Sequence, residues 1–300
     1  MEIISSYING NTQVDILSDG TKSRTINGDS AAVIHPESLD VKITNYCDAG
    51  CNFCHERSTI SGKHADLDKL SEILSSLPSG VEIAIGGGNP LAHPDLLPFL
   101  KRCKSQGLIC NLTVNQKHLL VFKKDLVSLI QDQLIYGLGI SYLSAKYLND
   151  VTPLINVTDN IVFHIIMGVN KISDIEKLNN YCLEFNKKCK ILVLGYKHYG
   201  FGINYYLKNK HIEDNKYQWY TDLASSFGNK NLILSFDNLA ISQLNLKRYF
   251  TEDAWRQFYM GDDFVYTMYI DAVEQKYAIS STSSNRVSFT TDLLTYFNNK

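Results

Sequence analysis

The stretch TNYCDAGCNFCHERST, residues 44–59, contains three of the chain's seven cysteines. Cys47, Cys51 and Cys54 follow the spacing C-x3-C-x2-C. They come directly after LDVKITNY (39–46), whose apolar residues are typical of a buried β-strand. Where thiols stay reduced, cysteines clustered in this way indicate metal binding or catalysis rather than disulfides. The stretch therefore predicts a thiol-dependent site at the end of a strand.

The composition limits the classes of protein to consider. The chain has 300 residues, of which 44% are hydrophobic and 20% are charged, enough for a sizeable core. The formal net charge of −2 does not favour a large nucleic-acid footprint or attraction to an acidic membrane. No apolar run approaches the roughly 20 residues of a membrane span, and the first residues lack the features of a secretory signal. We expect a cytoplasmic protein with reduced thiols and no membrane partner.

Strand-like and helix-like segments alternate through the middle of the chain. Helical periodicity falls at 67–77, 95–106, 123–133 and 173–186. The strand-like segments are 39–46, 81–87, 108–115, 136–143, 160–168, 189–196 and 231–238. Repeated βα units with buried strands predict an α/β protein with a parallel sheet, either curled into a barrel or doubly wound.

The two ends of the chain follow a different pattern. Residues 1–37 contain short β-prone runs separated by the turn signals NGN and SDGT, which predict a small hairpin unit. Residues 239–300 combine a helical segment at 251–261 with a predicted hairpin at 265–281. We therefore expect three parts: the N-terminal hairpin unit, a core at 38–238, and a C-terminal extension.

Three cysteines in a short loop suit one kind of metal group. They can bind three irons of a [4Fe–4S] cluster, whereas a plain electron carrier supplies four cysteines. The fourth iron then stays open, as reactive metal sites require. Zinc bound by the three cysteines and His55 is an alternative, although His55 directly follows Cys54 and the two would have difficulty facing one ion.

The cysteine loop resembles that of the radical S-adenosylmethionine (radical SAM) superfamily. The resemblance implies a partial (β/α)6 TIM-type barrel with small β additions at both ends. It implies one [4Fe–4S] cluster held by Cys47, Cys51 and Cys54, with SAM on the open iron. One electron then cleaves SAM to a 5′-deoxyadenosyl radical, which abstracts a substrate hydrogen. Phe53 matches the family's aromatic residue near the adenine.

Other strand ends resemble the family's SAM-binding segments. GGGNPLAHPDL (86–96) is similar to the GGEP segment that binds the SAM amino group, with Asn89 in place of the glutamate. An asparagine oxygen can accept a hydrogen bond from an ammonium but carries no charge, so the contact should be weaker. The resemblance carries over to nine cofactor-binding candidates in all: Phe53, Gly87, Gly88, Asn89, Pro90, Asn115, Ser141, Gly168 and Val169.

Candidates for substrate binding or proton transfer lie at later strand ends. Lys197 and Tyr199 fall where the sixth strand opens to the barrel mouth, and Asp237 follows the next strand. Surface residues with satisfied hydrogen bonds would give the same pattern. His55 and Glu56, beside the last cysteine of the loop, are expected to support the cluster or SAM, or to cap the following helix.

The C-terminal part of the chain bears on the class of substrate. The core layout and the C-terminal hairpin, which has no cysteines, look most like peptide-modifying members of the family, so we expect a peptide or protein substrate. A nucleotide or nucleic-acid base, another small molecule, and a non-catalytic SAM- or zinc-binding role remain alternatives. The resemblance also implies an external one-electron donor of the flavodoxin or ferredoxin type.

Overall fold

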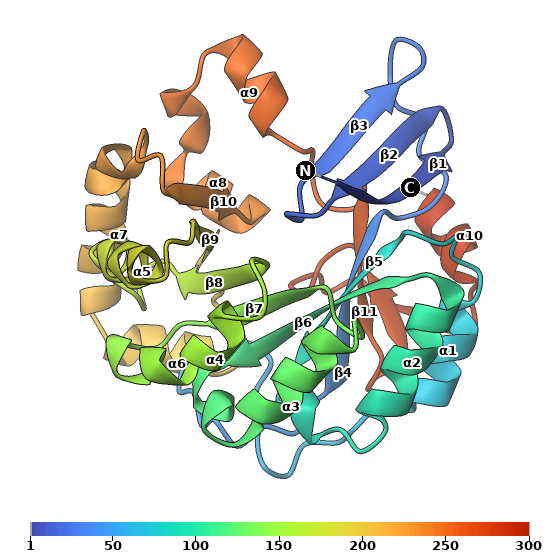
Figure 1. The fold of residues 1–300 in the computed structure, drawn as a ribbon, viewed down its shortest axis with the longest axis horizontal. Coiled ribbons are helices and arrows are strands. Elements are labelled where there is room, and N and C mark those ends of the chain that lie inside the picture. The colour runs from blue at the N-terminus through green and yellow to red at the C-terminus, as the bar shows by residue number, and fades with distance from the viewer. Residues whose placement is uncertain (1, 300) are drawn as a thin grey trace.

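The computed structural model describes residues 2–299. Its main feature is a ten-stranded sheet in the order β10-β9-β8-β7-β6-β5-β4-β11-β12-β13 (Figure 1). All neighbouring pairs from β10 to β11 are parallel, and only the last two pairs are antiparallel. The core strands are β4 (Ser38–Thr44), β5 (Glu82–Gly87), β6 (Ile109–Asn115), β7 (Gly137–Ser141), β8 (Ile161–Ile166), β9 (Cys189–Leu194) and β10 (Leu232–Phe236).

These strands confirm the α/β fold with a mostly parallel sheet. Seven successive strands run parallel, and β11 adds an eighth beside β4, so the count of six βα units is not confirmed. The boundaries expected near residues 38 and 239 stay predictions. The helices are α1 (Leu67–Leu74), α2 (Leu96–Gln106), α3 (Leu119–Gln131), α4 (Thr152–Ile155), α5 (Asp174–Glu184), α6 (Phe201–Lys208), α7 (His211–Asp222), α8 (Asn238–Leu244), α9 (Glu252–Phe258) and α10 (Leu293–Asn298).

The core lies between the sheet and the helices that cover its outer side. Alternate strand residues such as Ile83 and Ile85 are fully buried under these helices, while the residues between them face the barrel interior. Figure 1 shows α1, α2 and α3 side by side along this outer surface. Within residues 2–299, no helix is both long and apolar enough to cross a membrane.

The N-terminal sheet closes the end of the barrel where the parallel strands begin. It consists of β1 (Ile3–Asn9), β2 (Thr12–Leu17) and β3 (Lys22–Ile26), all antiparallel. Lys22 Nζ lies 2.6 Å from Glu82 Oε2 at the start of β5. Lys190 near the start of β9 donates to the backbone oxygen of Asp19 at 2.7 Å. These contacts leave the opposite end, where the strands finish, available for a site.

The C-terminal segment extends the main sheet. β11 (Thr267–Asp271) pairs with β4 in parallel and with β12 (Lys276–Ala278) in antiparallel fashion, and β13 (Val287–Ser288) follows. The hairpin predicted at 265–281 is therefore present. Because it lies beside β4, the strand that precedes the cysteines, it brings distant residues to the same cavity.

A buried ion pair helps to hold the N-terminal sheet in place. Arg24 donates to both oxygens of Glu37, with Nη2 2.6 Å from Oε2, and the Glu37 side chain is fully buried. We predict that Arg24→Met lowers the free energy of unfolding by about 3 kcal/mol, because it leaves a buried carboxylate without its main partner. Urea unfolding of the cluster-free protein measures this loss.

Arg256→Met is the matched control, because the Arg256 side chain is 72% exposed. Its loss should stay below about 1 kcal/mol. Equal losses in the two variants would contradict the assignment of a structural role to Arg24.

Candidate active site

The cysteine loop is closed by backbone hydrogen bonds. It connects β4 to α1, and its two arms pair where Cys47 N donates to Thr59 O at 2.9 Å and Thr59 N donates to Asn45 O at 3.1 Å. Ala65 N donates to Ile43 O at 2.9 Å, which returns the chain to the barrel. The three cysteines lie between these anchored arms, so their positions follow from the backbone of the loop.

The glycine turn after β5 lies against this loop. Gly88 N donates to Thr44 O at 2.8 Å, and Asn89 N donates to Tyr46 O at 2.6 Å. A Cβ on Gly88 would lie 2.1 Å from Tyr46 O, and Gly87 has a φ of +115°. Only glycine permits both features. The glycines predicted to let the backbone approach a ligand are thus also required by contact with the cysteine loop.

The three cysteines line a cavity of about 310 Å³. This volume is at the lower end of the range for small-molecule sites. The cavity extends from the loop down into the barrel, to Asp40 on β4 and His164 on β8. It brings together nine of the residues predicted from the sequence: Cys47, Cys51, Phe53, Cys54, Gly87, Gly88, Asn115, Ser141 and Lys197.

The structure does not bring the other candidates to the cavity lining, and their roles stay predictions. These are Asn89, Pro90, Gly168, Val169, Tyr199 and Asp237. Tyr199 is 48% exposed. Asp237 caps α8, because its Oδ1 accepts hydrogen bonds from Gly195 N at 2.9 Å and Ala240 N at 2.7 Å. Its carboxylate is thus already bound by backbone groups.

Asn89 is turned toward the cysteine loop. Its Nδ2 donates to Asp48 Oδ1 at 3.1 Å. Its Oδ1 is buried and has no hydrogen-bond partner within the described chain. Gly168 lies under α7: a Cβ there would be 2.8 Å from Ile212 Cγ2, and its carbonyl accepts from Asn215 Nδ2 at 2.9 Å. Helix packing therefore explains this glycine.

The cysteine thiols carry an electrostatic cost that a metal would relieve. Burial, and then repulsion from the neighbouring thiolates of Cys47 and Cys54, raises the pKa of Cys51 to about 11. Burial also raises the pKa of Cys47. All three cysteines line the same cavity. A bound metal group stabilises thiolates that protons would otherwise occupy, so the donor set fits an iron–sulfur cluster.

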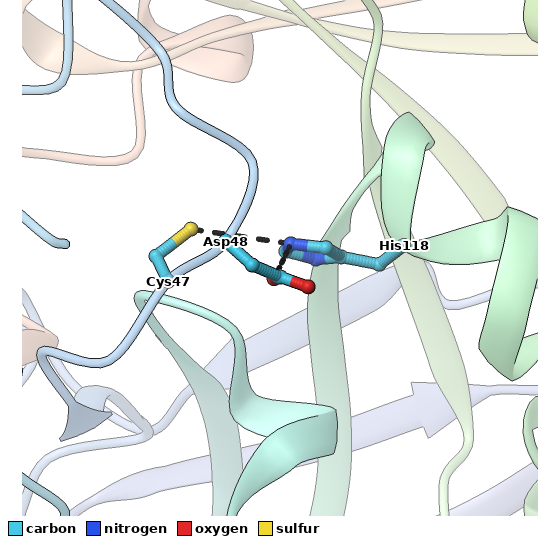
Figure 2. A group of neighbouring side chains, drawn as sticks. All are labelled: Cys47, Asp48 and His118. Atoms are coloured by element: carbon cyan, nitrogen blue, oxygen red, sulfur yellow. Dashed lines mark hydrogen bonds and ion pairs between the residues drawn. The ribbon is translucent and has the colours of Figure 1, made fainter. Parts of the chain in front are cut away.

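A histidine lies beside the first cysteine (Figure 2). His118 Nε2 is 3.9 Å from Cys47 Sγ and 3.2 Å from Asp48 Oδ1. The ligand atoms of these three residues all lie within 4.8 Å of one another, a spacing that could hold a metal ion. The histidine considered for zinc on the sequence, His55, instead has its Nε2 3.4 Å from Glu56 Oε1.

The hydrogen bonds of His118 define how its ring acts. Its Nδ1 accepts from the backbone N–H of Asn115 at 3.4 Å. Burial lowers the pKa of His118, although Asp48 acts in the opposite direction. A neutral ring that accepts at Nδ1 carries its proton on Nε2. His118 is thus assigned as a donor to Asp48, near the sulfur of Cys47, and a metal at Nε2 would require a change of tautomer. Asn115 Nδ2 lies 3.4 Å from Cys51 Sγ in the same region.

An ionic network that the sequence analysis did not anticipate forms one wall of the cavity. Lys42 Nζ lies 2.8 Å from Glu56 Oε2 and 3.1 Å from Asp271 Oδ2. Tyr269 OH donates to Glu56 Oε1 at 3.1 Å, and Arg286 Nη1 lies 2.8 Å from Asp271 Oδ2. The network joins the segment after Cys54 to the C-terminal hairpin.

Charge pairing in this network holds Glu56 ionised. Burial alone would raise the pKa of Glu56, but its hydrogen bond to His55 and the charge of Lys42 bring that pKa well below its usual range.

The sequence did contain a signal for the charged wall of the cavity. Asp40 and Lys42 alternate with apolar residues on β4, which places two charged side chains on the interior face.

Residues 41–199 match the family model described as the radical SAM superfamily, and the chain belongs to that superfamily. Membership implies a [4Fe–4S] cluster and SAM as cofactors. None of the curated proteins matches the chain in sequence.

Solved structures share the fold. SuiB of Streptococcus suis bound to the precursor peptide SuiA is 16% identical, with a TM-score of 0.61, and the match covers 88% of this chain and 65% of that one. SuiB bound to S-adenosylmethionine is 15% identical with the same TM-score, covering 87% and 65% of the two chains. The match thus spans less than two thirds of SuiB, and at this identity it shows the fold alone.

The contact between Gly88 and the cysteine loop can be tested directly. We predict that Gly88→Ala retains much less iron than wild type after anaerobic reconstitution, because the added methyl group displaces Tyr46 and the loop that follows. Gly86→Ala is the control, since a Cβ there meets only Thr113 Cβ at 4.0 Å. Iron analysis of both proteins decides, and equal iron in the two variants contradicts the prediction.

Proposed function

We propose that the chain is a radical SAM enzyme that modifies a peptide or protein. The observation that carries the proposal is the placement of Cys47, Cys51 and Cys54 in one anchored loop, facing one cavity at the end of a parallel barrel. This is the end where barrels of parallel strands hold their active sites. Membership of the superfamily agrees with this placement.

The cysteines are proposed to hold the [4Fe–4S] cluster by three of its irons, which leaves one iron for the amino and carboxylate groups of SAM. When bound, the reduced cluster supplies one-electron cleavage of SAM and, through it, hydrogen abstraction from the substrate. Five further residues of the cavity are proposed to contact SAM: Phe53, Gly87, Gly88, Asn115 and Ser141.

The chain's own groups orient the thiolates and close the site. Asn115 Nδ2 points a hydrogen-bond donor at Cys51, and His118 lies against Cys47. Such donors stabilise negative charge on sulfur and tune a cluster's potential. Lys197 reaches the cavity and donates to Ser281 Oγ at 2.9 Å, so it is proposed to contact SAM or substrate.

A peptide is the proposed substrate class. The support comes from the shared fold of SuiB, whose structure contains a precursor peptide. The formal net charge of −2 gives a nucleic acid less support. An external one-electron donor of the flavodoxin or ferredoxin type is proposed as the partner.

A mononuclear zinc site at Cys47, Asp48 and His118 is the second candidate, because these three residues meet at metal-ligand spacing (Figure 2). Zinc in proteins binds cysteine sulfur, histidine nitrogen and carboxylate oxygen. The acceptor role of His118 Nδ1 counts against it, since a histidine that binds zinc through Nε2 usually donates its other N–H.

Two variants separate the candidates. Cys54→Ser removes a proposed cluster ligand but none of the three zinc donors, whereas His118→Asn removes a zinc donor but no cluster ligand. We predict that Cys54→Ser loses the cluster and all formation of 5′-deoxyadenosine from SAM and dithionite. His118→Asn should still bind about four irons per chain. Metal analysis and chromatography of the reaction mixture provide the measurements.

The opposite pattern would reject the proposal. One zinc per chain that survives in Cys54→Ser and disappears in His118→Asn, with no 5′-deoxyadenosine from the wild-type protein, would make the chain a zinc-binding protein.

A further inference from the structure

Asp40 is an unpaired carboxylate inside the barrel. It lies on β4, opposite Ala84 of β5 and Tyr269 of β11, and its side chain borders the cavity. Within residues 2–299 the Asp40 side chain has no hydrogen bond and no ion pair. The Asp40 side chain is exposed, and it belongs to the lining of the cavity. The surrounding protein raises the pKa of Asp40 by desolvation.

The other charges of the cavity do not compensate Asp40. Lys42 is engaged by Glu56 and Asp271. Lys197 is the one cation that lowers the pKa of Asp40, yet it forms no ion pair with it, and Asp237 and Asp263 act in the opposite direction. Burial lowers the pKa of His164 to about 4, so this cavity residue is neutral near pH 7. Within the described residues, no cation therefore forms an ion pair with Asp40.

The position of Asp40 separates it from the proposed cluster and SAM. Asp40 precedes Thr44, the last residue of β4, by four positions, which corresponds to roughly 13 Å along a strand. The cysteines and the glycine turn all lie beyond that end of the strand. Asp40 thus belongs to the deep part of the cavity, where a side chain of the substrate would extend.

We propose that Asp40 binds a cationic side chain, lysine or arginine, of the peptide substrate. The inference rests on the proposed function, because it assumes that the cavity receives a peptide. A carboxylate that lines a cavity and has no partner in the protein is free to pair with a cation, and an ammonium or guanidinium from the substrate would bind it through charge-assisted hydrogen bonds. A neutral side chain of the same length leaves it unpaired, which is the physical origin of the selectivity.

Binding of short peptides to the cluster-loaded protein with SAM, without reductant, tests the proposal by titration calorimetry. The probes are acetyl-Gly-Lys-Gly-amide and its arginine, norleucine and glutamate analogues, with Gly-norleucine-Gly-amide as a probe whose only cation is its N-terminus. We expect the lysine and arginine probes to bind at least about tenfold more tightly than acetylated norleucine. The glutamate probe should bind most weakly.

Two variants test whether Asp40 is the residue that causes the preference for cationic probes. Asp40→Asn keeps the shape of the side chain and should abolish the preference for lysine over norleucine. Asp125→Asn removes an exposed carboxylate from α3 and should keep it. The comparison of probes on the wild-type protein needs no variant, so a misfolded variant cannot hide the answer.

Several outcomes overturn the inference. Equal affinity for the lysine and norleucine probes does so, as does a preference retained in Asp40→Asn. Tight binding of the norleucine probe with a free N-terminus would assign Asp40 to a terminal amine instead. Weaker SAM binding in Asp40→Asn with unchanged peptide selectivity would assign Asp40 to SAM. Because the readout is binding, these results stay distinct from a failure of SAM cleavage, which bears on the proposed function alone.

Discussion

The contact between the glycine turn after β5 and the start of the cysteine loop is the constraint on which the site depends. Two backbone hydrogen bonds, from Gly88 and Asn89, hold residues 44–46 against this turn. The distance between the two backbones leaves no room for a Cβ at Gly88. The backbone at the start of the cysteine loop is therefore fixed at the end of β4. This lets the loop hold three sulfurs together, although as thiolates they repel one another.

The two ends of the chain complete the barrel in different ways. The N-terminal sheet closes the end where the strands begin, through pairs such as Lys22 and Glu82. The C-terminal hairpin extends the sheet beside β4 and contributes Tyr269 and Asp271 to the cavity wall. The charged side chains that the two ends contribute, such as Lys22 and Asp271, form ion pairs, whereas Asp40 forms none. This contrast makes Asp40 a candidate for recognition rather than for stability.

Much of the fold could be predicted from the sequence because buried parallel strands and amphipathic helices have distinct periodicities. The cysteine spacing predicted a site in the loop after β4, and the three cysteines line one cavity there. Side-chain directions were not predictable in the same way. Asn89 follows a recognisable turn, yet its amide faces Asp48, and Asp237 ends a strand but caps the next helix. Tyr269 could not be placed beside Glu56 without the pairing of β11 with β4, which joins segments more than 200 positions apart. Asp40 and Lys42 did leave a signal, as charged residues alternating in an apolar strand.

Electron paramagnetic resonance of the anaerobically reconstituted, dithionite-reduced protein, recorded with and without SAM, shows whether the three cysteines hold a cluster with an open iron. We expect a reduced [4Fe–4S] signal whose shape changes when SAM is added, because SAM binds the iron that has no cysteine. A protein that shows no such signal, or a signal that SAM leaves unchanged, would contradict this expectation.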